Sequence, residues 1–365
     1  MITQDISSGK FKKALIIGGG LSGFSAALLL RQKGLDVVIS DQKSINPAYK
    51  TKLTAEGIKI FEDGHHPDHI DQCGLIITSP GVSPSNILLE LAISRNITIL
   101  SEIDLALLAF EGYTIGITGT NGKSTICSMV EHGLIKLGFN AKAGGNFGDP
   151  PSLMIAEKRA PSIMILELSS YQLESSKHIL LNAASFTNFS SDHLARHGSL
   201  ENYFKIKWRI FDRLVHDGLG ILSQEVLSAA RTLGLSLPKR HCVIDDINLN
   251  FEDNQITRFP HNISNLKTAN LFIDSIVQHC RIKSPFVLND YRGLPFRCQK
   301  IAEFEGVAIF NDSKSTNVES TLAALSGFNE KVILMMGGQG KGESFSPIVT
   351  YKHIIGHLIT FGASG

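Results

Sequence analysis

A glycine-rich stretch, residues 116–125 with the sequence GITGTNGKST, limits the folds open to this chain more than any other feature. The apolar run 113–117 is typical of a buried strand, and residues 126–137 carry apolar side chains at helical spacing. A strand, a glycine loop and a helix in this order form a phosphate-binding arrangement, because backbone N–H groups and the helix N-terminus converge on one anion. The stretch therefore predicts an α/β unit that binds a phosphate group.

The polar residues of this stretch favour a nucleotide as the ligand. Lys123 places an ammonium group beside the terminal phosphates, and Ser124 or Thr125 offers a hydroxyl to Mg²⁺. The spacing departs from the strict G-x-x-x-x-G-K-[ST] pattern, because Ile117 occupies the place of its first glycine. A glycine turn beside an ordinary lysine is the alternative, which the strand and the helix on the correct sides make weaker.

Length and composition bound the class of protein. The chain has 365 residues, of which 43% are hydrophobic, so we expect two or three domains that each bury a core. A formal net charge of +1 argues against a protein whose main function is to bind nucleic acids or acidic membranes. The first ten residues are polar, and no apolar run approaches the ~18 residues of a membrane span, so we expect a soluble, cytoplasmic protein. The five cysteines form no C-x-x-C pair, which favours reduced thiols over a zinc site.

A second glycine loop follows the first apolar run of the chain. Residues 13–17 are typical of a strand, 18–23 match G-x-G-x-x-G, and 25–33 continue as a helix. The next strand, residues 35–40, ends at Asp41, where a dinucleotide-binding fold places the carboxylate that holds a ribose hydroxyl. Taken alone, this pattern predicts an NAD-binding domain.

The following segment leaves a second interpretation of that loop open. Further short strands are expected at 58–61, 75–78 and 97–100. The strand 75–78 runs into the rigid turn 79–84 (SPGVSP), at the carboxyl end of a strand, where parallel sheets bind ligands. A site for a nucleotide-bearing substrate is therefore as consistent with the pattern as a nicotinamide site.

Strands and helices alternate again after the phosphate loop, which predicts a mononucleotide-binding α/β domain. Glu167 ends an apolar run, so it suits an Mg²⁺ ligand or a water-orienting group, or else it caps the following turn at Ser169 and Ser170. His193, taken alone, is more often a structural histidine, and Lys207 in the helical stretch 200–214 an ordinary surface lysine. The strands expected in this segment are residues 163–168, 183–189, 220–223 and 242–245.

A third alternating segment begins at Arg297. Strands are expected at 307–310, 332–336 and 358–361, with a helix at 320–325. Three strands are few for a domain that folds alone. We therefore expect the chain to be a C-terminally truncated form or a fragment of a longer protein.

Several motifs together resemble the Mur ligase family, and among its branches the one that adds D-glutamate. The matching stretches keep the family's order along nearly the whole chain: residues 18–23, 79–81, 119–125, 145–148, 166–174, 192–193, 203–207, 261–262 with 265, 293–295, 311–317 and 337–341. The resemblance implies three consecutive α/β domains with mostly parallel sheets. These are a Rossmann-like domain for the UDP-substrate, a P-loop-type central domain for ATP and an incomplete Rossmann-like domain for the amino acid, at residues 1–110, 111–295 and 296–365.

The resemblance also implies an activity. It is that of an ATP-dependent amide ligase of peptidoglycan precursor synthesis, and hence of cell wall biogenesis, cell shape and cell division. ATP would phosphorylate the alanine carboxylate of UDP-N-acetylmuramoyl-L-alanine, and the amine of D-glutamate would attack the acyl phosphate. The expected form is a monomer without nucleic-acid or membrane partners.

Each matched residue receives a role from the resemblance. The UDP-substrate would be held by Gly20, Leu21, Ser22, Asp41, Ser79, Pro80, Gly81 and Asn146. ATP would be held by Gly119, Thr120, Asn121, Gly122, Lys123, Ser124, Thr125, Asn262, Asn265, Arg297 and Asp312. The catalytic residues would be Lys123, Glu167, His193 and Lys207, with two Mg²⁺ ions at Ser124, Glu167, His193 and a carbamylated Lys207. D-glutamate would meet Lys314, Thr316 and Lys341.

Two departures from the family pattern qualify this expectation. Phe296 stands where the family usually has a histidine, so only stacking on the nucleotide is left to that position. A serine- and phenylalanine-bearing segment that completes the family's D-glutamate site would lie beyond Gly365. The chain could then bind UDP-substrate and ATP yet ligate poorly. The alternatives are a non-catalytic relative that binds these ligands and an NAD-dependent oxidoreductase built on residues 18–23 and Asp41.

Overall fold

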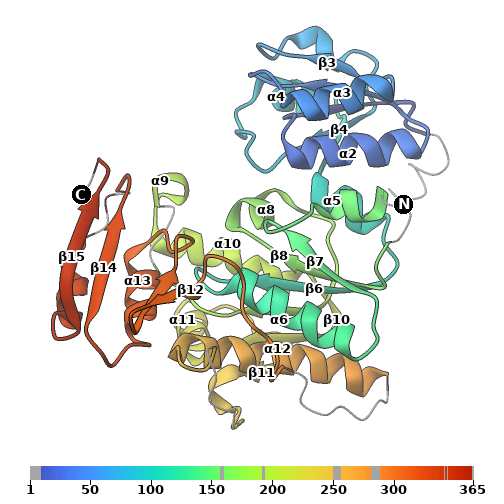
Figure 1. Cartoon of the computed structure of the whole chain (residues 1–365). Helices are drawn as coiled ribbons and strands as arrows, with labels where there is room; N and C mark the ends of the chain where they lie inside the picture. The colour runs from blue at the N-terminus through green and yellow to red at the C-terminus, as the bar shows by residue number, and fades with distance from the viewer. Residues whose placement is uncertain are drawn as a thin grey trace. The chain divides into compact units, whose positions relative to one another are not determined.

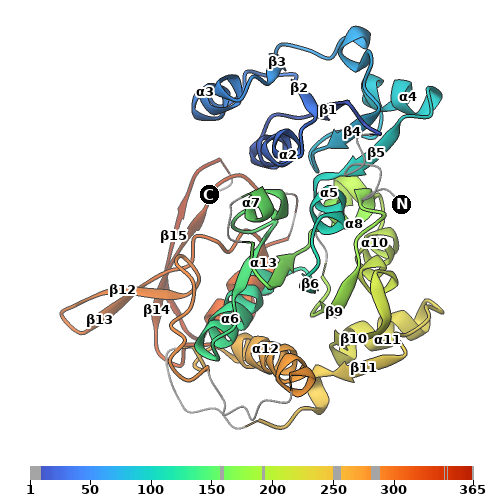
Figure 2. The ribbon, with the colours of Figure 1, turned by 90° about the vertical axis from the view of Figure 1, so that its right-hand side faces the viewer.

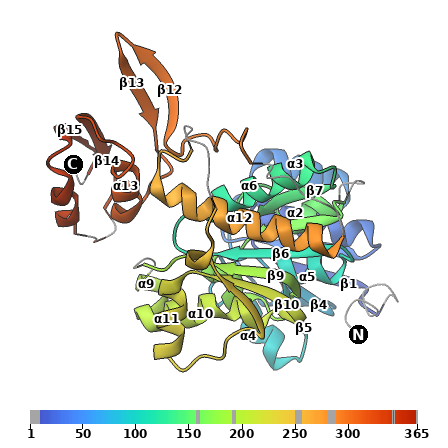
Figure 3. The same ribbon diagram turned by 90° about the horizontal axis from the view of Figure 1, so that it is seen from below.

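A computed structural model describes most of the chain, shown from three directions in Figure 1, Figure 2 and Figure 3. The chain forms two compact units: residues 1–127 with 134–243, and residues 128–133 with 244–365. The residues described are 10–156, 160–190, 194–249, 256–280, 288–340, 342 and 344–363.

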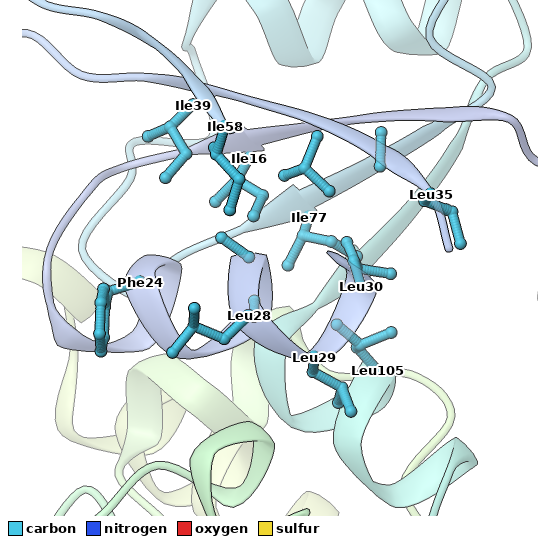
Figure 4. Packing of buried hydrophobic residues seen from close by; sticks show 14 of the residues in the cluster. Ile16, Phe24, Leu28, Leu29, Leu30, Leu35, Ile39, Ile58, Ile77 and Leu105 are labelled. Carbon is cyan, nitrogen blue, oxygen red and sulfur yellow. The ribbon is translucent and has the colours of Figure 1, made fainter. Parts of the chain in front are cut away.

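The first unit begins with a five-stranded parallel sheet of order β3-β2-β1-β4-β5. Side chains alternate along β1, so Ile16 faces helix α2 while Leu15 and Ile17 face α4 on the other side of the sheet. Figure 4 shows Ile16, Ile39 and Ile77 above the apolar face of α2. Because both faces are covered, the central strands β1 and β4 are apolar along most of their length. The elements are β1 (Lys13–Ile17), α2 (Leu21–Gln32), β2 (Asp36–Ser40), α3 (Pro47–Ala55), β3 (Lys59–Phe61), β4 (Leu75–Thr78), α4 (Ile87–Ser94) and β5 (Thr98–Ser101).

A six-stranded parallel sheet of order β11-β10-β9-β6-β8-β7 follows in the first unit. Strand β6, which precedes the phosphate loop, lies between β8 and β9. The carboxyl ends of all three strands therefore meet at that loop. The strands are β6 (Tyr113–Thr118), β7 (Ala141–Gly145), β8 (Ile163–Glu167), β9 (Leu181–Phe186), β10 (Leu214–Leu222) and β11 (Arg240–Val243). The helices are α5 (Glu102–Leu108), α6 (Lys123–Lys136), α7 (Pro151–Ala156), α8 (Ser170–Ser175), α9 (Leu194–His197), α10 (Leu200–Asp212) and α11 (Gln224–Thr232).

Carboxylates at the start of α5 connect the two sheets of this unit. Asp104 accepts hydrogen bonds from the backbone N–H of Lys177 at 3.0 Å and of His178 at 2.6 Å. Glu102 is buried and accepts from the backbone N–H of Ser152 at 2.7 Å, near the start of α7. The second carboxylate oxygen of Glu102, Oε2, is buried with no hydrogen-bond partner among the described residues. Burial raises the pKa of Glu102 from 4.5 to about 7, although the bond from Ser152 opposes this.

Replacing Glu102 by glutamine is expected to stabilise the protein at pH 8. Because the pKa of Glu102 is raised in the folded state, the folded protein keeps a proton that the unfolded chain releases above pH 4.5. The free energy of unfolding is therefore highest below pH 4.5 and falls as the pH rises to about 7 and above, where the folded protein must also release that proton. Glutamine stays neutral and still accepts from Ser152. The gain at pH 8 is up to roughly 3 kcal/mol, since each pKa unit corresponds to about 1.4 kcal/mol.

The measurement is the denaturant midpoint of unfolding at pH 5 and pH 8. The exposed Glu111→Gln variant is the control and should leave the pH dependence unchanged. Equal pH dependence in the wild-type and Glu102→Gln proteins would show that Glu102 is ionised normally.

The second unit contains one long helix and two small two-stranded sheets. Strands β12 and β13 pair antiparallel (Figure 3), whereas β14 and β15 pair parallel (Figure 1). Val318 and Leu325 of α13 pack with Ile348 and Ile354, and these side chains form a small hydrophobic core in the second unit. The elements are α12 (Pro260–His279), β12 (Gln299–Phe304), β13 (Val307–Asn311), α13 (Val318–Leu325), β14 (Val332–Gly337) and β15 (Ile355–Phe361).

The expected α/β class with mostly parallel sheets is confirmed, with local differences. Helix α2 begins at Leu21, inside the G-x-G-x-x-G stretch of residues 18–23, rather than at residue 25. Strands β7 and β12 were not expected, because one is rich in glycine and the other is largely exposed. The C-terminal segment consequently opens with an antiparallel hairpin instead of a strand followed by a helix. Across the described residues, every helix is too short or too polar to span a bilayer.

Candidate functional site

The phosphate loop leaves β6 at Thr118 and enters α6 at Lys123. Gly119 and Gly122 have φ of 156° and 80°, in the region that favours glycine. A Cβ atom on Gly119 would also lie 2.3 Å from Oγ1 of Thr187, on the neighbouring strand end. Backbone conformation therefore favours glycine at both positions, and lack of space requires it at Gly119.

Two lysines reach the same carbonyl of this loop. The ammonium of Lys123 donates to the carbonyls of Gly119 and Thr120 at 3.0 and 2.8 Å. The ammonium of Lys207 donates to the Gly119 carbonyl at 2.7 Å and lies 4.9 Å from the ring centroid of Tyr203. Lys207 is only 2% exposed, so the interpretation as a surface lysine is wrong. The loop thus brings two cations together at the carboxyl end of β6.

Glu167 lies at the end of β8, beside the loop. Its carboxylate accepts from the hydroxyl of Ser124 at 2.5 Å and from the side-chain amide of Asn146 at 2.8 Å. The side chain is 3% exposed. The alternative in which Glu167 caps the next turn is wrong, because Ser169 and Gln172 cap that turn reciprocally.

The oxygens of Glu167 and Ser124 are a suitable donor set for Mg²⁺. This ion favours oxygen ligands and usually combines one or two carboxylates with waters and substrate phosphates. Within the described ranges, no group of three or more His, Cys, Asp or Glu side chains could hold a metal on its own. Ser124 and Glu167 therefore fit an ion whose other ligands are phosphate and water. His193, assigned to a second ion, lies outside the described residues.

The first glycine loop lies where the strand order of the five-stranded sheet reverses, between β1 and β4. Ser79, after β4, donates its hydroxyl hydrogen bond to the carbonyl of Gly18 at 3.1 Å, so both loops meet there. The third glycine of the motif, Gly23, leaves no room for a side chain, because its Cβ would lie 1.8 Å from the carbonyl oxygen of Gly18. The predicted substrate residues 20–22 and 79–81 thus lie at the same edge of the sheet, at the carboxyl ends of β1 and β4.

Asp41 contacts the loop itself. Its Oδ2 accepts from the backbone N–H of Gly19 at 2.6 Å, and its Oδ1 accepts from that of Lys43 at 2.8 Å. Ser40, just before it, binds the Nδ1 atoms of His65 and His69 at 2.7 and 3.0 Å. Asp41 therefore shapes the loop in this structure, in addition to any contact with a ligand.

Three of the nucleotide-binding residues expected in the second unit take part in hydrogen bonds within that unit. Asn265 donates its side-chain amide to Oδ1 of Asn262 at 3.1 Å on one face of α12, where both are buried. Asp312 accepts from the backbone N–H of Cys298 at 2.9 Å and from the hydroxyl of Ser315 at 2.5 Å. These bonds hold the segment that carries Arg297.

Lys314, one of the residues expected to bind the amino acid, contacts this segment. The backbone N–H of Lys314 donates to the carbonyl of Phe296 at 3.2 Å, and Thr316 follows in the same loop. Phe296 itself has φ of 65°, a conformation that few residues with a side chain adopt. Lys341 lies outside the described residues.

Asn188 is a site residue that the sequence analysis missed. Its Oδ1 accepts from the backbone N–H groups of Thr120 and Asn121 at 3.1 and 2.9 Å, and its amide donates to the Asn121 carbonyl at 2.9 Å. Asn188 follows β9, which neighbours β6. The rule that strand carboxyl ends meet at a ligand could have identified it.

Comparisons with known proteins agree with this arrangement. Residues 12–101 match the N-terminal domain of MurD-like Mur ligases, and residues 117–273 match the Mur ligase middle domain. A UDP-N-acetylmuramoylalanine–D-glutamate ligase of Leptospira borgpetersenii is 34% identical over 361 residues, covering 93% of this chain and 75% of that protein. The enzyme of the same name from Lactococcus lactis is 32% identical, covering 98% of this chain and 84% of that protein.

Solved structures share the fold. UDP-N-acetylmuramate-alanine ligase MurC from Thermotoga maritima has a TM-score of 0.59 at 18% identity, covering 96% of this chain and 85% of that one. MurF ligase from the same organism, in complex with ADP, has a TM-score of 0.59 at 14% identity, covering 89% and 81%. With sequence identity to the curated ligases above 30% over most of both proteins, the chain belongs to the Mur ligase family.

Proposed function

We propose that the chain is an ATP-dependent amide ligase that adds D-glutamate to UDP-N-acetylmuramoyl-L-alanine in peptidoglycan precursor synthesis. The observation that carries the proposal is the meeting of Lys123 and Lys207 at the Gly119 carbonyl, with Glu167 bonded to Ser124 beside them. The names of the curated relatives supply the substrates. ATP is proposed as a further substrate from the phosphate loop at residues 119–125. Because ATP and a UDP-linked sugar are then the substrates, we propose a cytoplasmic location, and we propose a monomer.

The chemistry needs charge neutralisation and positioning more than covalent help from the protein. The γ-phosphoryl group of ATP passes to the alanine carboxylate, which forms an acyl phosphate and ADP. The amine of D-glutamate then attacks the acyl carbon, loses a proton and expels inorganic phosphate. Lys123 would offset the phosphate charge, with the N–H groups of residues 119–122 and the hydroxyl of Thr125 around it.

Metal binding is proposed at Ser124 and Glu167, with a second ion at His193 and a carbamylated Lys207. When bound, Mg²⁺ supplies positive charge to the phosphate oxygens. Asn146, which donates to Glu167, would orient the muramoyl substrate next to that ion. A carbamate on Lys207 would form when the neutral amine attacks CO₂ and releases one proton, which leaves an anion suited to a hard cation.

The remaining ligands follow from the matched motifs. We propose domains at residues 1–110, 111–295 and 296–365. In the first, Gly20, Leu21, Ser22, Asp41, Ser79, Pro80 and Gly81 would hold UDP. For ATP, Asn262 and Asn265 would face the adenine ring. Arg297 and Asp312 would contact the phosphates and the ribose. D-glutamate carboxylates would meet Lys314, Thr316 and Lys341, where cations suit them.

The test of this function is release of phosphate from ATP. We expect release only when UDP-N-acetylmuramoyl-L-alanine and D-glutamate are both present, with L-glutamate as the control. Phosphate release at the same rate with and without D-glutamate would contradict ligation. Tight binding of NADH without binding of the UDP-substrate would favour the oxidoreductase instead.

Replacing Asn188 by alanine is expected to raise the KM for ATP about tenfold. The variant removes the acceptor that holds the N–H groups of Thr120 and Asn121, so the loop loses its preset shape. Steady-state kinetics with varied ATP measures the effect.

Asn182→Ala is the matched control, because Asn182 at the opposite end of β9 accepts from the backbone N–H and hydroxyl of Thr114 at 2.8 and 3.0 Å. It should lower stability and leave the KM for ATP near wild type. An equal rise of KM in both variants would mean that Asn188 has only a structural role.

A further inference from the structure

The start of α12 is packed against the end of α13. Phe259 precedes the helix and is 1% exposed, with its ring centroid 5.7 Å from that of Phe328 and 6.4 Å from that of Phe310. Its ring lies on the backbone of Gly327, where an added Cβ would be 2.2 Å from Cδ1 of Phe259. Gly327 is therefore required by the close approach of this ring.

Arg258 strengthens the same contact. Its Nε donates to the carbonyl of Gly327 at 2.8 Å. Its guanidinium lies 4.8 Å from the ring centroid of Phe328 and 5.7 Å from that of Phe310. One side chain thus combines a charged hydrogen bond with two cation–π contacts.

His261, in the first turn of α12, packs on the same aromatic group. Its ring centroid lies 5.8 Å from that of Phe259, and its Nδ1 has no hydrogen-bond partner among the described residues. Burial lowers the pKa of His261, although the backbone of Ala323 and the charge of Asp312 oppose this. His261 belongs to a motif that the resemblance singled out without giving this residue a role.

The next residues of α12 are those proposed to bind adenine. Asn262 adjoins His261, and Asn265 follows one turn later. Asp312, proposed to bind the nucleotide, lies near His261 and is bonded to Ser315. The contacts to the end of α13 and the adenine residues thus lie together at positions 258–265, just before and in the first turns of α12.

We propose that Arg258 and Phe259 are positioning residues, which through Gly327 and Phe328 link nucleotide binding on α12 to the placement of α13. We call these four residues the α12 latch. This inference rests on the proposed function, because it uses ATP as the ligand of Asn262 and Asp312. When the latch residues are in contact, the nucleotide-binding residues of α12 keep a fixed distance from Asp312. The protein then loses less conformational freedom when the nucleotide binds. Conversely, bound nucleotide holds α13 against α12.

The test is ADP binding by calorimetry in the full chain. Arg258→Gln is expected to weaken ADP about fivefold, because it removes the hydrogen bond and the cation–π contacts at a partly exposed site. Arg258→Lys keeps a cation and should restore part of the affinity. The exposed Lys331→Gln variant removes a charge elsewhere in this unit and should bind ADP as wild type does. Affinity for the UDP-substrate should not change in any of them.

A second variant and a second readout complete the test. Gly327→Ala forces Phe259 to move and should weaken ADP tenfold or more. In the wild type, ADP should slow hydrogen exchange at residues 323–328, and Arg258→Gln should reduce that protection. Unchanged ADP affinity in both variants would overturn the latch alone. Absence of ADP binding in the unaltered chain would overturn the proposed function and the latch together.

Discussion

Replacing Lys123 by alanine is expected to lower ligase turnover about 10²–10³-fold, the range measured when one preorganised donor to a transition-state charge is removed. The ammonium of Lys123 already lies at the loop, bonded to the carbonyls of Gly119 and Thr120. No other side chain of the helix start carries a positive charge, since the first turn of α6 reads KSTI. Phosphate release under saturating substrates measures the loss.

Affinity for the UDP-substrate should stay within about twofold in this variant. The residues proposed to hold UDP follow β1 and β4, which belong to the five-stranded sheet, whereas Lys123 follows β6 of the other sheet. Lys136→Ala, an exposed position in the last turn of α6, is the control and should keep full activity. A large loss of UDP-substrate binding in Lys123→Ala would contradict the division of ligands between the two loops.

The strands that sequence predicted best are those buried on both faces. Strands β1 and β4 have the expected bounds because a parallel sheet covered by helices selects continuous apolar runs. Strand β7, with the sequence AKAGG, is specified by pairing with β8 rather than by its own residues. Strand β12 is exposed along most of its length, so no burial pattern marks it.

Site residues were harder to predict than strands, because their partners come from distant segments. The position of Lys207 could have been predicted from helical spacing. Lys207 follows Tyr203 by four residues and precedes Ile210 and Phe211 by three and four, so it lies on the apolar stripe of α10. A lysine on that stripe is buried, which the sequence analysis did not use. The role of Asp41 in holding the Gly19 N–H could not be read from spacing, because spacing fixes the position of a carboxylate and not its hydrogen-bond partner.

Lys207→Ala is expected to lower turnover at least about 10²-fold, and a short carboxylic acid such as acetate or propionate is expected to restore part of it. The reason is geometric. Lys207 is 2% exposed and bonded to Gly119, so its removal leaves a space beside the phosphate loop that a small anion can fill. If the working group is a carbamate, an added carboxylate supplies the missing anion for the second Mg²⁺. Turnover against acid concentration measures the restoration.

Lys205→Ala is the matched control for this experiment, because Lys205 lies on the same helix, is 47% exposed and pairs with Glu201. It should retain activity and respond to no acid. Thermal unfolding of Lys207→Ala separates loss of the site from loss of the fold, since the space left by a buried side chain also lowers stability. A folded Lys207→Ala protein that no acid restores would remove support for the carbamate. The amine of Lys207 would then act as a cation on the Gly119 carbonyl, and loop geometry would be its whole contribution.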